Sequence, residues 1–319
     1  MARPDKADKE AEFRGRLRRR TAGGFLQAGC GETRKERKIF QIFPLQVCAC
    51  AASTNLECAN SSAKMGKNME KLQLPNVTLA AMTSVKIYET IKALEYSMRG
   101  IDFGQVVLIT HRKPLSLPKA ITYKHTSKLD DIDAFNYKMV YELGRYIETD
   151  YVLLIHYDGF VVHPEKWRDE FFDYDYIGSP WPIPEPGKKH CYHDVYGNLC
   201  RVGNSVSLRS RRLLDFPAAA SLKWEMDEDG FYNEDIFLCC MNKHKIEEAG
   251  MKIAPVEVAK YFGHEHPVPE VLEVDAPFVF HKWWGRNAAY PVFENPWTRR
   301  WLKFKDMVRP LLFWRHRKR

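Results

Sequence analysis

The chain has 319 residues, of which 45% are hydrophobic and 28% are charged, with 18 glycines and 18 prolines. This is the composition of a globular protein, and it excludes a wholly disordered, collagen-like or coiled-coil chain. The net charge of +8 is unevenly distributed: residues 1–64 carry +6, residues 294–319 carry +7, and the body between them carries −5. Because the body is mildly acidic and has no zinc-finger spacing or helix-turn-helix pattern, we expect no nucleic-acid partner.

The first 64 residues differ in composition from the rest and are predicted to form a disordered or poorly ordered leader. An apolar patch at 39–52 follows a basic run, which leaves a signal or anchor as the alternative, although 14 interrupted residues are too short to span a membrane. Eight cysteines without a CxxC spacing indicate a reducing compartment. We therefore expect a cytoplasmic protein.

The first ordered half alternates strands with helices. Short apolar runs predict buried strands at 77–82, 105–110, 121–126 and 151–155. Apolar residues spaced by four, three and four predict a helix over 87–98 that ends at Gly100, and Asp133 is expected to cap a second helix running to Ile147. This order predicts an α/β domain with a mostly parallel sheet flanked by helices.

The second half is richer in loops and aromatic residues. We expect a helix over 164–172, an aromatic loop over 176–182, strands at 199–208, 256–262 and 278–281, and one helix over 234–249. The terminal segment 291–319 reads as a basic amphipathic helix and tail. Residues 296–319 can lie on an anionic membrane surface, and the alternative is a helix docked on the domain with a solvated basic tail.

The strongest candidate for chemistry follows the strand at 151–155. Ligands of open α/β sheets bind at the carboxyl ends of the strands, and here the strand runs directly into His156, Tyr157, Asp158 and Gly159. His156 and Asp158 are two residues apart and are expected to point the same way as metal ligands, with Gly159 allowing a close approach. Capping by both side chains is the alternative.

Three later segments offer further candidates. Trp181, between two prolines, is either a platform for a sugar ring or a packed core residue. Small polar residues at 201–210 either bring the backbone close to a ligand or form a strand and an N-cap. Glu234 and Asp235 begin a helix, where the dipole stabilises carboxylates by about 0.3–1 kcal/mol, or where one of them accepts a proton from an attacking hydroxyl.

Taken together, the segments LLIHYDGF, YIGSPWP, VGNSVSLRS, FYNEDIF and FVFHKWW resemble the Domain of Unknown Function 5672 family, which is placed among GT-A-type glycosyltransferases. The resemblance covers about residues 74–285. It implies a GT-A-like fold over 74–290, with a loop-rich acceptor half and a nucleotide-sugar donor.

The resemblance also implies roles for individual residues. His156 and Asp158 stand where the superfamily has its metal-binding DxD, and His281 matches the late histidine of that site. Because histidine replaces the first carboxylate, Mn²⁺ suits the site better than Mg²⁺. Asp235, with Glu234 beside it, matches the general base of inverting members. The implied donor-binding residues are Thr83, Val85, Lys138, Tyr157, Asn204 and Ser207, and Trp181 is the implied sugar platform.

The implied activity is metal-assisted transfer of a sugar to an acceptor hydroxyl. Asp235 deprotonates that hydroxyl if configuration is inverted, and orients the acceptor or the donor if configuration is retained. Two alternatives stay open at this point. A metal-dependent hydrolase would use His156, Asp158 and His281 to activate water, and a degenerate transferase would bind nucleotide or carbohydrate without turnover.

Overall fold

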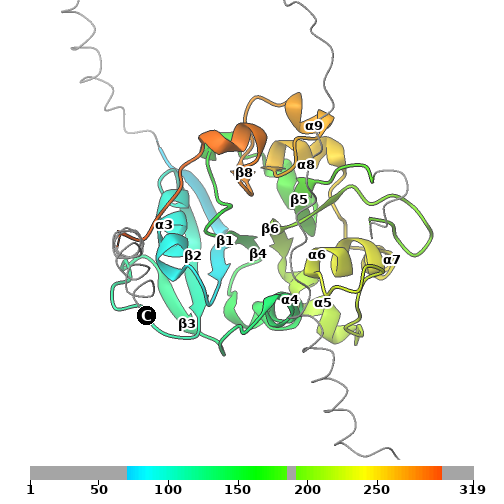
Figure 1. Cartoon of the computed structure of the whole chain (residues 1–319), viewed down its shortest axis with the longest axis horizontal. Coiled ribbons are helices and arrows are strands. Elements are labelled where there is room, and N and C mark those ends of the chain that lie inside the picture. The colour runs from blue at the N-terminus through cyan, green and yellow to red at the C-terminus, as the bar shows by residue number, and fades with distance from the viewer. Residues whose placement is uncertain (1–69, 185–191, 297–319) are drawn as a thin grey trace, which may run out of the picture. The chain divides into compact units, whose positions relative to one another are not determined.

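The computed structural model describes residues 70–184 and 192–296, drawn in colour in Figure 1. The chain divides between Gly66 and Lys67, so every described residue belongs to the second of two units. The predicted leader, and the predicted basic helix from residue 297 onward, lie outside the described residues. Within the described part, no helix is long and apolar enough to cross a membrane.

A six-stranded sheet forms the centre of the described unit. Its strands are β1 (Leu72–Met82), β2 (Ile101–Thr110), β3 (Thr122–His125), β4 (Tyr151–Leu154), β5 (Tyr176–Pro180) and β6 (Val202–Ser210), in the spatial order β3-β2-β1-β4-β6-β5. The pairs among β1, β2, β3 and β4 are parallel, and β6 runs antiparallel to both of its neighbours. The predicted α/β class with a mostly parallel sheet is therefore confirmed.

Both faces of the sheet are covered, which explains the continuous apolar runs of the strands. In β1, Leu79 and Ala81 belong to one core cluster, together with Leu94 of helix α3 (Ile87–Ser97). Ala80 and Met82 point to the opposite face and belong to a second cluster. That face is covered by α4 (Ile132–Tyr141) and the 3₁₀ turn Leu143–Tyr146.

The start and end of α4 differ from the prediction. Asp131, not Asp133, is the N-cap, because its carboxylate accepts the backbone N–H of Ala134 at 2.8 Å. The helix ends at Tyr141, and the apolar face predicted to reach Ile147 continues through the 3₁₀ turn instead. Leu143 and Ile147 are buried all the same, so the packing was predicted correctly and the continuous helix was not.

The second half consists of short elements. They are α5 (Arg211–Ala219), α6 (Glu234–Ile236), the π-helical turn Phe237–Met241, α7 (Lys243–Glu248), α8 (Val256–Phe262), β7 (Gly263–His264), α9 (Pro269–Leu272), β8 (Val279–Phe280) and the 3₁₀ turn Gly285–Ala289. Strands β7 and β8 pair in parallel as a small second sheet. In Figure 1, α8, α9 and β8 lie together at the top of the molecule.

Several predictions for this half were wrong in detail. Residues 256–262 form helix α8, because Pro255 precedes its first turn and Ala259 and Phe262, three residues apart, are its buried side chains. The expected helix over 234–249 is interrupted where Asn242 N–H bonds to the carbonyl of Phe237, five residues back. Residues 176–180 form strand β5 rather than a loop.

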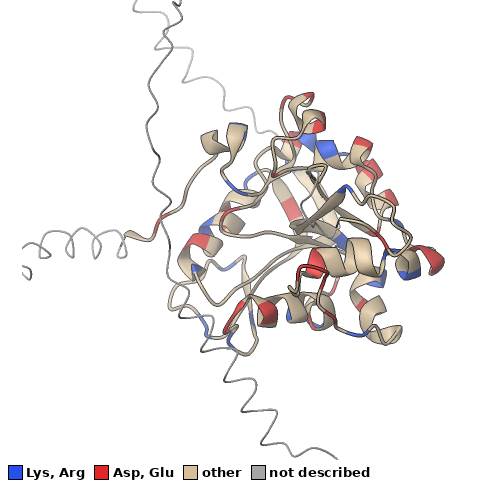
Figure 2. Cartoon of the chain, turned by 45° about the vertical axis from the view of Figure 1, so that its right-hand side comes forward, with Lys and Arg blue, Asp and Glu red and all other residues tan. Residues whose placement is uncertain are grey.

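The predicted helix over 164–172 is replaced by two 3₁₀ turns, Pro164–Lys166 and Asp169–Asp173. Phe171 is fully buried and Trp167 packs against the same core. Cys239 and Cys240 are buried free thiols. Acidic and basic residues are interspersed on the helices in Figure 2.

Candidate functional site

A cavity of about 440 Å³ opens where the carboxyl ends of β1 and β4 meet. Chain order explains this position. From β1 the chain adds β2 and β3 on one side and then returns to place β4 on the other side of β1. The strand order reverses between β1 and β4, and such a switch point leaves a crevice at the carboxyl ends of the strands.

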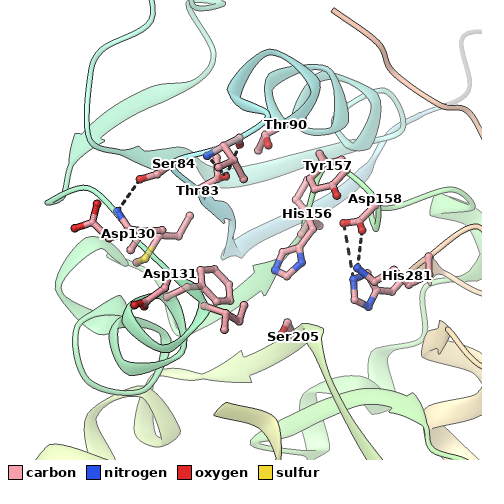
Figure 3. Close-up of a pocket in the computed structure, with 17 residues that line it drawn as sticks. Thr83, Ser84, Thr90, Asp130, Asp131, His156, Tyr157, Asp158, Ser205 and His281 are labelled. Carbon is pink, nitrogen blue, oxygen red and sulfur yellow. Dashed lines mark hydrogen bonds and ion pairs between the residues drawn. The ribbon is translucent and has the colours of Figure 1, made fainter. Parts of the chain in front are cut away.

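One end of the cavity is formed by the segment after β1 (Figure 3). The hydroxyl of Thr83 donates to the carbonyl of Val85 at 2.6 Å, which fixes the turn between strand and helix. Ser84 Oγ accepts the backbone N–H of Leu129 at 2.9 Å, so the loop before α4 is tied to the same place. Thr83 and Val85, both expected to contact a nucleoside, line this end of the cavity.

The other end holds His156, Asp158 and His281 (Figure 3). The chain leaves β4 in a tight turn in which His156 N–H bonds to the carbonyl of Gly159 at 2.7 Å. A Cβ on Gly159 would lie 2.8 Å from Cδ2 of His281 and 2.9 Å from the carbonyl oxygen of Phe280, so only glycine lets β8 approach this turn. One ligand atom of each of the three residues lies within 4.8 Å of the others.

These three side chains fit a divalent cation. Nε2 of His156 and Nε2 of His281 have no hydrogen-bond partner among the described residues, although both are buried. Burial, with His281 nearby, lowers the pKa of His156 to about 3, so the ring is neutral at pH 7 and free to coordinate. Two imidazoles and one carboxylate suit Mn²⁺ better than Mg²⁺, which prefers oxygen ligands alone.

Lys282 is a further member of this site. Its Nζ lies 2.6 Å from Oδ2 of Asp158, and the residue holds a left-handed φ of 63°. Burial alone raises the pKa of Asp158, but His281 and Lys282 outweigh burial, so the pKa lies below its usual value. The carboxylate is therefore ionised, with Oδ2 on the ammonium and Oδ1 3.9 Å from Nε2 of His281.

Asp235 and Glu234 sit side by side but have different environments. Glu234 is 2% exposed and pairs with the buried guanidinium of Arg209 at 3.2 Å. Breaking such a pair costs about 3–5 kcal/mol, so Glu234 holds the fold together. Burial, then Glu234 and Glu265, raise the pKa of Asp235 to about 8. A carboxyl group with a pKa near neutral pH is suited to accept and release a proton.

Asp235 does not line the 440 Å³ cavity, but it contacts the wall of the cavity. Oδ2 of Asp235 accepts the backbone N–H of Asn204 at 3.1 Å, and the next residue, Ser205, is part of the cavity lining. Asn204 adopts a φ of 104°, which is rare for any residue but glycine, so this strand segment is held in a strained conformation.

The other predicted residues lie in different places. Tyr157 lines the cavity. Lys138 is outside the lining and pairs with Glu142 at 2.6 Å on the same helix. Ser207 is fully buried in β6, where its hydroxyl donates to the carbonyl of Ser205.

Trp181 is 3% exposed, and its ring stacks on Tyr192 at a centroid distance of 4.8 Å. A Cβ on Gly203 would lie within 1.7 Å of the Trp181 ring, so the strand passes directly over the indole. Burial and these contacts favour packing, the second of the two interpretations of Trp181.

The sequence interpretation missed Lys282, Ser205 and Glu265. Lys282 follows His281 in the FVFHKWW segment, and a cation next to a metal-ligating histidine was an available signal. Ser205 lies between Asn204 and Ser207, the two residues of β6 that were predicted to bind the donor. Glu265 comes to the site only through the pairing of β7 with β8, and no local pattern indicates that pairing.

Comparison with known proteins agrees with the family expected from the motifs. The family model described as "Protein of unknown function (DUF5672)" matches residues 123–281. The matched segment includes His156, Asp158, Asp235 and His281. No curated protein matches the chain.

Two solved structures are similar in fold. The apo form of the glycosyltransferase GlyE from Streptococcus pneumoniae TIGR4 shares 10% identity, with a TM-score of 0.36 over 68% of this chain and 56% of GlyE. S. aureus TarS 1–349, in complex with UDP-GlcNAc, shares 9% identity, with a TM-score of 0.37 over 68% of this chain and 62% of TarS. The chain thus spans less than two thirds of either protein.

Proposed function

We propose that this protein is a glycosyltransferase that moves a sugar from a nucleotide-sugar donor to an acceptor hydroxyl. The observation that carries the proposal is the cavity at the β1–β4 switch point, which joins a loop suited to a nucleoside with a His156, Asp158 and His281 cluster. A nucleoside diphosphate needs such a pair of subsites, because its base and ribose are largely uncharged and its diphosphate is anionic.

In this arrangement Thr83 and Val85 contact the nucleoside, and Tyr157 lies between them and the cation cluster. His156, Asp158 and His281 would hold Mn²⁺, or less favourably Mg²⁺. When bound, the cation supplies Lewis-acid stabilisation of the departing diphosphate. Lys282 places a second positive charge at the same end of the cavity, so the chain itself contributes to binding the anion.

For transfer with inversion, the acceptor oxygen forms a bond to the anomeric carbon while the bond from that carbon to the donor phosphate breaks. The phosphate oxygen leaves with the bonding electron pair, and the acceptor proton passes to the carboxylate of Asp235. The raised pKa of Asp235, due first to burial, matches this role because a base works best when its pKa is close to the working pH.

A binding experiment tests the proposal. Thermal unfolding of the full chain is followed with UDP, GDP and CDP and their sugars, including UDP-GlcNAc, each with and without Mn²⁺. A ligand present at about 100 times its Kd stabilises the folded state by about 2.7 kcal/mol, so an unfolding temperature several degrees higher is expected for one nucleotide. Mn²⁺ should increase that shift.

Two variants complete the test. Asp158→Ala should abolish the Mn²⁺-dependent part of the shift, whereas Asp102→Asn, at an exposed carboxylate paired with Lys71, should leave it unchanged. Asp235→Asn should keep nucleotide binding and abolish sugar transfer. If no nucleotide raises the unfolding temperature, the proposal is overturned. If a nucleotide binds but no acceptor receives a sugar, a degenerate transferase is favoured.

A further inference from the structure

The buried carboxylate of Glu265 lies directly behind the candidate metal site. Strands β7 and β8 are parallel, and His264 pairs with Phe280. The residues that follow, Glu265 after β7 and His281 after β8, therefore lie opposite each other. His281 N–H bonds to the carbonyl of His264 at 2.9 Å, which continues the ladder by one step. As a result Oε1 of Glu265 lies 3.1 Å from Nδ1 of His281.

Both side chains are withdrawn from solvent, with 12% of Glu265 and 9% of His281 exposed. A charged carboxylate is costly to bury unless it is paired. Among the described residues, His281 faces one oxygen of Glu265, while Asn204 and, at 3.9 Å, Nε2 of His266 face the other. Nδ2 of Asn204 donates to Oε2 of Glu265 at 3.0 Å. The carboxylate is therefore held from two sides.

Asn204 is itself fixed. Its Oδ1 accepts the backbone N–H of Val206 at 3.0 Å, so the amide cannot turn over without losing both bonds. Its φ of 104° is strained for asparagine, and its backbone N–H donates to Asp235. One strained residue thus contacts both the carboxylate behind His281 and the proposed base.

We infer that Glu265 is a positioning residue that holds His281 in the tautomer with a proton on Nδ1, leaving the Nε2 lone pair free for a cation, and that Asn204 fixes Glu265 for this task. A metal-binding histidine whose second nitrogen faces a carboxylate has its ring orientation and tautomer set by that contact. Both ring nitrogens of His281 are buried without a hydrogen bond of standard geometry in the described part of the chain, so the nearest carboxylate, Oε1 of Glu265 at 3.1 Å from Nδ1, decides which nitrogen carries the proton.

The first experiment needs no metal, so it is independent of the metal-assisted function on which the role of Glu265 rests. The ring nitrogens of the metal-free full chain are observed by long-range ¹H–¹⁵N correlation at pH 8, and the His281 signals are assigned by their loss in His281→Asn. We expect the Nδ1–H tautomer in the wild type. In Glu265→Gln an amide NH2 group, which can only donate, replaces one of the two oxygens that face His281 and Asn204, so we expect the Nε2–H tautomer to become populated.

The second experiment measures Mn²⁺ affinity by calorimetry. Loss of a carboxylate behind a metal-binding histidine weakens metal binding by about 10–100-fold, and Glu265→Gln should fall in this range. Glu265→Asp keeps the charge and should restore part of the affinity. Glu270→Gln is the matched control, since Glu270 pairs with Arg201 at 3.0 Å and belongs to α9.

The outcomes distinguish the positioning role of Glu265 from the proposed metal-assisted function. An Nε2–H tautomer in the wild type, or a tautomer unchanged in Glu265→Gln, overturns the inference whatever the metal result. If the wild type binds no Mn²⁺ but the tautomers behave as expected, the metal-assisted function fails and the positioning role stands. A fold check by ¹H–¹⁵N backbone spectra accompanies each variant, and Glu265→Asp provides the answer if Glu265→Gln does not fold.

Discussion

At the scale of single residues, the site is a set of charges whose protonation states are set by their neighbours. His156 is kept neutral by burial, Asp158 is kept ionised by His281 and Lys282, and Asp235 retains its proton up to about pH 8. Neutral imidazole, ionised carboxylate and a protonatable base are the three states that cation binding and proton transfer require.

The raised pKa of Asp235 predicts a pH profile for the proposed transfer. The base acts only when ionised, and its pKa is about 8, so kcat/KM should rise by about tenfold per pH unit below pH 7 and level off above pH 8. Initial rates between pH 6 and pH 9.5 measure this. Asp102→Asn should show the same profile, and a flat rate between pH 6 and 9 would exclude Asp235 as the base.

Lys282 shares Asp158 with any bound cation, and this predicts opposite effects on two ligands. Lys282→Met removes a positive charge next to the cluster, so Mn²⁺ should bind at least about fivefold more tightly, since repulsion between charges near a protein surface amounts to 1 kcal/mol or more. The nucleoside diphosphate should bind more weakly. Calorimetry with each ligand alone tests this, with Lys260→Met as the control at a cation paired with Glu273. If the affinities for Mn²⁺ and for the nucleoside diphosphate change in the same direction, this prediction is contradicted.

At the scale of elements, the strands of the first half were predictable, whereas several strands and helices of the second half were not. Runs such as 106–109 are apolar throughout, because the sheet is covered on both faces, and this leaves a clear signal in the sequence. The segment 256–262 has valines two residues apart that suggest a strand, yet its buried residues are Ala259 and Phe262. Tertiary contacts, not local propensity, decide whether such a short segment forms a helix or a strand.

The same distinction holds for the site. His156 and Asp158 follow a strand that the sequence reveals, so their position at the end of the sheet was predictable. Glu265 reaches His281 through a two-residue parallel strand pair, which is too short to leave a periodic pattern. Trp181 has a sequence context that fits either packing or sugar binding, and only the approach of Gly203 distinguishes them.

The packing of the Trp181 indole against Gly203 of β6 predicts the effect of one methyl group. Gly203→Ala would place its Cβ inside the indole ring, so the free energy of unfolding should fall by about 1–3 kcal/mol or more. Urea denaturation measures this. Trp181→Leu in the same chain should recover part of the loss by making room. If Gly203→Ala is as stable as the wild type, the indole is mobile and its role as a sugar platform returns.

At the scale of the whole molecule, the site joins parts of the chain that are far apart in sequence. The segment after β1 supplies the proposed nucleoside end, the turn after β4 supplies two candidate ligands, and the residue after β8 supplies the third. Only the sheet order and the β7–β8 pair bring them together, as Figure 1 and Figure 3 illustrate. Global stability and site geometry should therefore depend on the same few contacts.

His264 is the contact at which this dependence can be measured. Its carbonyl accepts His281 N–H and Nδ2 of Asn287, and its ring Nε2 lies 2.9 Å from the carbonyl of Lys260. Burial lowers the pKa of His264 to about 4, below the ordinary value of 6.5. The folded state thus keeps the ring neutral where the unfolded chain already binds a proton.

Between pH 6.5 and pH 4 the unfolded state binds more protons at His264, so the free energy of unfolding falls as the pH falls, by at most about 1.4 kcal/mol per pH unit. His264→Gln keeps a donor for Lys260 but does not titrate. Urea denaturation at pH 7 and pH 4.5 should show a larger loss in the wild type than in His264→Gln, and His163→Gln, at a more exposed histidine, should behave like the wild type. Parallel losses in the wild type and His264→Gln would show that protonation of His264 is not coupled to global unfolding, and would contradict the prediction.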